Sequence, residues 1–326
     1  MLSESNPLIK FEKINDKDMK EKYSVLINSE YEYSSQLSDY VNIFFKYHNI
    51  EEKSSSNKSD FDSVNQIKVI TGNKTLITLE EYINLFGLSG VVSSEKNGSI
   101  PISSEEENLT RNNLSANDVI KLIFDFTVSL NILKDIGLSI LKIDNNDFHV
   151  FVPSKIYNKS ISNGTSNDVS NGTSNDVSNG TSNDVSNGIR NSIKNKLNEE
   201  DKREYINEVI FIYTGSVGNG LYPIDDKDNI NIEKPIEFSN NAPEMIYFNK
   251  NKTLPYNFNI RTSYYVIALF IIDLLFVTST EDEGKDNSLP PEKLLILLEP
   301  LYYTKLYYFL LRCLQPNIND RYFLFV

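Results

Sequence analysis

The pattern of apolar and polar positions predicts short strands near the N-terminus and longer helices further along the chain. Short apolar or alternating runs over residues 8–14, 24–28 and 67–70 predict β-strands. Between the second and third of these runs, residues 32–47 carry apolar side chains at the three- and four-residue spacing of a helix. A shorter amphipathic helix is expected over residues 76–86.

Later in the chain the apolar runs become longer. Residues 116–136 predict a long buried helix, with Ser115 as its N-cap and Gly137 as its C-terminal stop. The remaining predicted elements are two strands, over 147–153 and 208–213, and two helices, over 263–277 and 291–314.

The helix over residues 263–277 is apolar on all sides and therefore allows two interpretations. It could be a membrane span, which would make the chain a membrane-anchored protein. The run is shorter than the ~20 apolar residues of a typical span, and it contains Asp273. An all-apolar helix is also what the centre of a large domain requires, so we expect a buried core helix and no membrane span.

Two stretches lack any apolar periodicity and predict disorder. Residues 51–63 are polar and rich in serine, and residues 162–188 contain the octad SNGTSNDV three times. A repeat that stacks into a solenoid needs an apolar face, whereas this octad offers one valine. The expected structure is a disordered insertion over residues 156–200; a tract of phospho-acceptor residues is the functional alternative.

The net charge and the cysteine content narrow the range of partners and cellular locations to be expected for this protein. The net charge of −13 disfavours binding to nucleic acid, which requires a basic surface, and it disfavours anionic membranes. The single cysteine, Cys313, cannot form an intramolecular disulfide, so we expect a reducing, cytoplasmic location and a small buried side chain. Two histidines are too few for a His-rich metal site.

Several motifs resemble those of protein kinases. Ala242-Pro243-Glu244 is similar to the Ala-Pro-Glu that ends the kinase activation segment, and residues 263–277 resemble the central helix of the C-lobe. The segment from Cys313 to Arg321 resembles the CL-x-P-x-P-x-x-R stretch near the end of the kinase fold. The order of the predicted elements also resembles that of the kinase fold. The resemblance covers residues 67–155 and 208–321 most consistently, and it is weaker before residue 66.

This resemblance implies an α+β, two-lobed protein kinase-like fold. It places a reduced, β-rich N-lobe at residues 1–72 and a larger, mainly helical C-lobe at residues 73–326. In the family, the glutamate and the arginine at the matching positions form a buried ion pair. The resemblance therefore implies that Glu244 and Arg321 have a structural role and pair with each other.

The positions that carry catalysis in kinases hold different residues here. A glycine-rich phosphate loop is missing, because residues 1–71 contain no glycine. Matched on Gly137, the catalytic aspartate position is Lys142, and the metal-binding asparagine position is Asp147. The position of the second metal-binding aspartate, after the strand over 208–213, is Thr214. A shift of two residues would put Asp144 at the catalytic position instead.

These changes favour a pseudokinase, that is, a catalytically inactive kinase-like domain that binds a protein partner as an interaction or scaffold module. No cofactor and no metal are then expected, and Asp147 is the one weak candidate for a ligand contact. The alternative is a divergent active kinase that uses ATP and Mg, with Asp144, Asp147, Asp225 or Asp226 in unusual roles.

Overall fold

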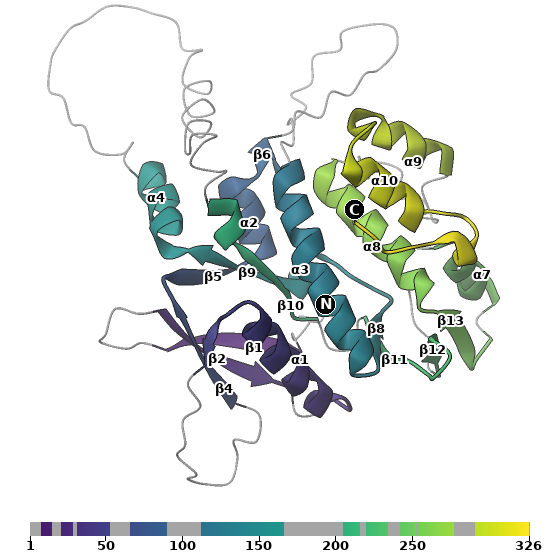
Figure 1. The fold of residues 1–326 in the computed structure, drawn as a ribbon, viewed down its shortest axis with the longest axis horizontal. Helices are drawn as coiled ribbons and strands as arrows, with labels where there is room; N and C mark the ends of the chain where they lie inside the picture. Colours follow the sequence, from purple (N-terminus) through teal and green to yellow (C-terminus); the bar gives the residue numbers. More distant parts are fainter. Residues whose placement is uncertain are drawn as a thin grey trace, which may run out of the picture.

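A computed structural model describes residues 8–14, 21–28, 31–52, 66–89, 112–165, 205–215, 220–233, 242–251, 253–276 and 291–325. Within these residues the protein has a mixed α+β architecture built from small antiparallel sheets and helices. In Figure 1 the first sheet and helix α1 lie on one side of the long helix α3, and helices α8, α9 and α10 lie on the other.

The first sheet has the strand order β1-β2-β4-β3 and is antiparallel throughout. Its strands are β1 (Ile9–Ile14), β2 (Glu21–Ile27), β3 (Glu51–Glu52) and β4 (Gln66–Gly72). Helix α1 (Ser34–Tyr47) follows β2 and buries the side chains that gave its helical spacing, from Leu37 to Phe45. The predicted strands over 8–14, 24–28 and 67–70 and the predicted helix are confirmed as β1, β2, β4 and α1. The stretch 51–63 differs from the predicted disorder at its beginning, because Glu51 and Glu52 pair with β4 as strand β3; residues 53–63 lie outside the described residues.

A second sheet, of order β10-β9-β5, lies against the long helix. It consists of β5 (Lys74–Thr78), β9 (Phe148–Pro153) and β10 (Ile210–Tyr213). Helix α2 (Leu79–Phe86) follows directly after β5. We predicted a helix from residue 76, but residues 76–78 belong to β5. The helix begins later because the hydroxyl of Thr78 accepts the N–H of Glu81 and caps it there.

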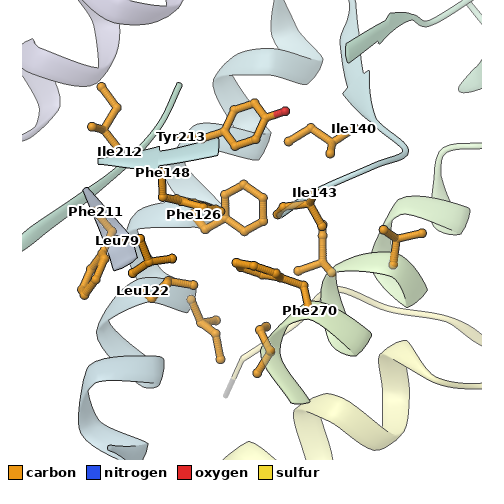
Figure 2. Close-up of a cluster of buried hydrophobic side chains, with 14 of the residues drawn as sticks. Leu79, Leu122, Phe126, Ile140, Ile143, Phe148, Phe211, Ile212, Tyr213 and Phe270 are labelled. Carbon is orange, nitrogen blue, oxygen red and sulfur yellow. The ribbon is translucent and has the colours of Figure 1, made fainter. Parts of the chain in front are cut away.

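Helix α3 (Ala116–Asp135) runs through the centre of the molecule, with Ser115 as its N-cap as predicted. Gly137 adopts a left-handed backbone, with φ of 82°, just beyond its C-terminal end. Figure 2 shows the packing around helix α3: Leu122 and Phe126 from α3 meet Phe148 from β9 and Phe270 from α8. The rings of Phe148 and Phe270 stack with their centroids 5.4 Å apart.

Several small pairings complete the sheets. β8 (Leu138–Ile140) pairs with β11 (Leu221–Pro223), β12 (Asn229–Ile232) with β13 (Tyr256–Asn259), and β6 (Leu88–Ser89) with β7 (Asn112–Asn113). The β8–β11 pairing holds the chain just before Lys142 and Asp147, and strand β9 follows directly after them.

The C-terminal helices are α7 (Pro243–Asn251), α8 (Arg261–Leu275), α9 (Pro291–Leu298) and α10 (Lys305–Cys313). Short 3-10 turns, η4 (Glu299–Leu301) and η5 (Ile318–Asp320), precede and follow α10. The single helix predicted over 291–314 is therefore wrong. Pro300 interrupts it, because proline has no N–H for the helix ladder and its ring clashes with the preceding turn.

Helix α8 is a core element, with most of its side chains buried among those of α3 and α10. Across the part of the chain that the structure describes, no helix combines the length and apolar character needed to cross a membrane.

The segment 156–200 differs from the prediction at its beginning. Helix α4 (Ser154–Thr165) continues directly from β9, where we expected disorder from residue 156. The first turn of α4 is ordered because Ile156 and Tyr157 pack on the core, and the Tyr157 hydroxyl donates to Glu81 at 3.0 Å. Most of the octad tract lies outside the described residues. The next described residue is Tyr205, just before η3 (Ile206–Glu208).

Candidate functional site

Asp147 occupies the point where the loop after β8 meets strand β9. It is the last residue of the 3-10 turn η1 (Asn145–Asp147) and is buried. Its carboxylate oxygen Oδ2 accepts the N–H of Asp144 at 2.9 Å, and Asp144 Oδ1 accepts the N–H of Asn146 at 2.8 Å. The two carboxylates therefore close this turn as a capping box, which is a structural use of both groups.

Thr214 lies directly against Asp147, so the structure brings together two of the three positions identified from the sequence. The backbone carbonyl of Asp147 accepts the N–H of Thr214 at 2.7 Å and its hydroxyl at 3.2 Å. The same hydroxyl lies 3.2 Å from Nδ1 of His149 on β9. Burial lowers the pKa of His149 to about 4, so its imidazole is neutral at pH 7.

Lys142 is half-buried in the loop between β8 and η1, and its backbone is held close to Gly220. The N–H of Leu141 donates to the carbonyl of Gly220 at 2.8 Å. Gly220 has a φ of 115°, and a Cβ at this position would lie 2.5 Å from the carbonyl oxygen of Lys142. Only glycine fits this approach, so the backbone of the loop is fixed by a neighbouring segment.

Backbone hydrogen bonds connect the first sheet to Asp147. The N–H of Asn28, at the end of β2, donates to Leu8, and the N–H of Leu8 donates to Gly215 at 3.1 Å. Ile9 likewise donates to Thr214 at 3.2 Å. Because Thr214 is bonded to Asp147, protein backbone bridges the space between residues 25–28 and 142–147.

An aromatic side chain from β1 packs beside this bridge. Phe11, which is paired with Val25 of β2, has its ring centroid 5.4 Å from that of His149 and 5.9 Å from that of Phe151. Phe45 of α1 meets Phe151 from another direction at 6.2 Å. The first sheet is therefore joined to the β9–β10 hairpin by apolar packing as well as by hydrogen bonds.

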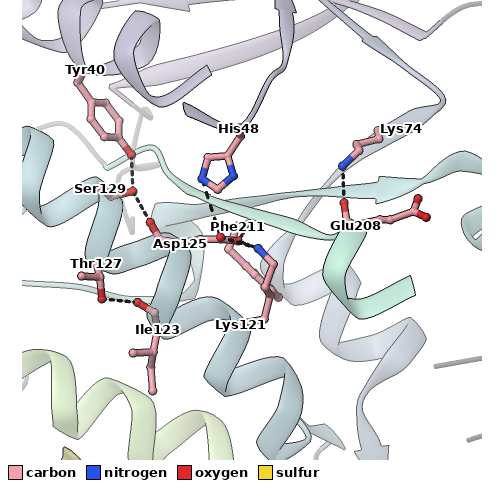
Figure 3. A network of polar contacts seen from close by, with 10 residues as sticks. All are labelled: Tyr40, His48, Lys74, Lys121, Ile123, Asp125, Thr127, Ser129, Glu208 and Phe211. Atoms are coloured by element: carbon pink, nitrogen blue, oxygen red, sulfur yellow. Dashed lines mark hydrogen bonds and ion pairs between the residues drawn. The ribbon is translucent and has the colours of Figure 1, made fainter. Parts of the chain in front are cut away.

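A buried polar network joins α1, α3 and β10 (Figure 3). Asp125 of α3 pairs with Lys121, accepts the N–H of Phe211 at 2.9 Å, and lies 3.8 Å from Nε2 of His48. Burial raises the pKa of Asp125, although Lys121 opposes this effect. Burial and the nearby Lys121 and Lys74 lower the pKa of His48 to about 4.

Only indirect signals in the sequence point to this network. Asp125 lies within a helix that its apolar residues predict. A carboxylate at a core position of such a helix requires buried partners, and that requirement was the signal available.

Glu244 and Arg321 form the ion pair that the resemblance implied. The guanidinium of Arg321 is fully buried and donates to both carboxylate oxygens of Glu244, at 2.7 and 3.0 Å. Its Nε donates to the carbonyl of Gln315 at 2.7 Å, and its plane lies over the ring of Tyr265 at 4.8 Å. These contacts tie the start of α7 to the segment after α10 and to α8.

Other candidate ligand groups lie elsewhere. Asp225 and Asp226 are exposed in the turn between β11 and β12, and Asp225 Oδ1 accepts the N–H of Lys227 and of Asn229, each at 2.8 Å. Among the residues that the structure describes, no three His, Cys, Asp or Glu side chains gather as a metal site would require. Cys313 is buried, as predicted, and its thiol lies 3.4 Å from the carbonyl of Tyr322.

Comparison of the chain with models of protein families, and with curated proteins, finds no match.

Proposed function

We propose that this protein is a degenerate protein kinase-like domain that acts through protein binding and does not transfer phosphate. The observation that carries the proposal is the backbone bridge from Asn28 through Leu8 and Gly215 to Asp147, in the space that a nucleotide would need. Phe11, packed against His149, adds apolar bulk beside that bridge.

The side chains at the matched positions support the same proposal. Lys142 has an amino group where a kinase uses a carboxylate base, and Thr214 offers no carboxylate for magnesium. The buried Glu244–Arg321 pair supports a kinase-like fold that is kept for its shape. Two lobes, over residues 1–72 and 73–326, and a cytoplasmic location belong to this proposal.

Thermal unfolding with and without Mg-ATP tests the proposal. A ligand present at a hundredfold excess over its Kd adds ~2.7 kcal/mol of apparent stability. For a domain of this size that corresponds to a rise in Tm of several degrees. We expect no rise with millimolar Mg-ATP beyond that seen with magnesium alone.

A divergent active kinase is the second candidate, because η1 places Asp144 and Asp147 within one turn. A rise in Tm with Mg-ATP that disappears in Asp147→Ala and persists in the control Asp135→Ala, an exposed aspartate at the end of α3, would overturn the proposal in favour of this candidate. Each variant is compared with its own Tm without nucleotide, so a loss of stability caused by the substitution does not affect the result.

A further inference from the structure

Four tyrosines surround the turn between η4 and the start of α10, and we call them the tyrosine ladder: Tyr302, Tyr303, Tyr307 and Tyr308. The ring centroids of Tyr303 and Tyr302 are 6.2 Å apart, those of Tyr302 and Tyr307 4.8 Å, and those of Tyr307 and Tyr308 5.3 Å. The rings therefore form one continuous set and not four separate side chains.

Three of the four rings of the tyrosine ladder are exposed, whereas Tyr307 is partly buried against the core on the well-packed side of α10. Leu306, Phe309 and Leu310 are buried, whereas Tyr302 and Tyr308 are exposed. Tyr303 is 90% exposed and has a left-handed backbone with φ of 65°, a conformation that bulky residues rarely adopt. Core packing does not account for this placement, and tyrosine is a residue type enriched where proteins bind one another.

The chemistry of the ladder and the charge of the chain point to the type of partner. The face of a tyrosine ring attracts cations, and the planar guanidinium of arginine stacks on it better than an ammonium does. This protein already uses that contact twice, with Arg261 over Tyr322 at 5.2 Å and Arg321 over Tyr265 at 4.8 Å. A net charge of −13 would also steer a basic partner toward the surface.

We propose that the tyrosine ladder docks an arginine-containing, extended segment of a protein partner. Exposed Glu299 and Lys305 flank the ladder and cancel one another, so the selectivity for arginine comes from the rings and the long-range attraction from the whole chain. The inference rests on the proposed role as an interaction module, and it names the surface and the chemistry of the partner.

Fluorescence anisotropy with two labelled octapeptides tests this docking on the full chain. One peptide alternates arginine with serine, and the other alternates lysine with serine, so that the two carry the same charge. We expect the arginine peptide to bind more tightly at physiological salt. Tyr303→Ala and Tyr308→Ala should each weaken its binding about two- to fivefold, the range expected for an exposed cation–π contact.

Two controls keep the result interpretable. Tyr47→Ala removes a tyrosine of α1 that is 64% exposed and should leave binding unchanged, whereas Tyr303→Phe keeps the ring and should bind almost as the unaltered chain does. Equal binding of both peptides, or equal binding by the alanine variants and the control, overturns the proposal. Self-association that sedimentation shows to depend on Tyr303 also overturns it, because a second copy is then the occupant.

The outcome is separable from the test of the proposed function. A Tm rise with Mg-ATP would reject the noncatalytic role while leaving the peptide result intact. Loss of selectivity for the arginine peptide would reject the docking surface without bearing on nucleotide binding.

Discussion

At the scale of single residues, the Glu244–Arg321 pair shows how burial changes the value of an ion pair. Exposed pairs contribute little, because water screens the charges and the side chains lose conformational freedom. Arg321 is fully buried, and both of its terminal nitrogens donate to Glu244. Removal of the carboxylate would leave a buried guanidinium with only backbone carbonyls and the ring of Tyr265 as partners.

Glu244→Ala is therefore expected to lower the free energy of unfolding by ~3 kcal/mol, the lower end of the range for breaking a buried pair. Urea denaturation followed by circular dichroism measures this change. Glu12→Ala is the matched control, because Glu12 pairs with Lys10 on an exposed face of β1, and it should cost less than ~1 kcal/mol. Similar losses in the two variants would contradict the expected role of the buried pair.

At the scale of elements, the sequence predicts correctly those helices that depend on residues close together along the chain. Residues 32–47 and 116–136 form helices because their apolar spacing is a local property, as is the Ser115 cap of the second helix. The start of α2 moved because strand β9 recruits residues 74–78 as its partner, which is a contact distant in sequence. The break at Pro300 is a signal present in the sequence, because proline is disfavoured inside a helix, but the predicted helix over 291–314 did not include this break.

The candidate site divides in the same way. The positions of Asp147 and Thr214 followed from motif spacing, and their contact follows from the β9–β10 pairing. The packing of Leu8 and Phe11 onto that hairpin could not be predicted, because nothing in residues 8–14 indicates which distant segment they meet. The Asp125 network was missed for the same reason, since its partners come from α1 and β10.

The segment between β10 and β11 supplies the prediction at this scale. Gly220→Ala should cost ~3 kcal/mol of unfolding free energy, because the new Cβ would meet the Lys142 carbonyl at 2.5 Å in a left-handed backbone. Gly137→Ala shares the unusual backbone but has open space around it, so it should cost only ~1 kcal/mol. Equal losses by chemical denaturation would mean that the close approach of the loop is unimportant.

At the scale of the whole molecule, the buried residues of the first sheet and of the helical part belong to one continuous core. Both histidines lie where these parts meet: His48 beside Asp125 of α3, and His149 beside Phe11 of β1. Each is partly buried, and this burial lowers its pKa to about 4. The protonation of either imidazole therefore opposes the association of the two parts.

Stability should consequently fall as the pH falls from ~6.5 toward 4. In this window the unfolded chain binds protons at both histidines, whose ordinary pKa is ~6.5, while the folded protein does not. Asp125 contributes with the opposite sign, because its pKa is raised on folding. Urea midpoints measured across this range should drop in the unaltered chain and drop less steeply in the double variant His48→Gln, His149→Gln; identical slopes would disprove the assignment.

The pairing of β9 with β10 determines how the protein tolerates a change in the length of the segment between these strands. Ile210 lies opposite Phe151, so the chain leaves this sheet and returns to it at neighbouring strands, with the identical octads in between. A doubling of the length of such a connection adds only about 0.6 kcal/mol of closure entropy. A change in the number of octads should therefore cost the fold little, whereas the register of the two strands constrains the residues that flank the insertion.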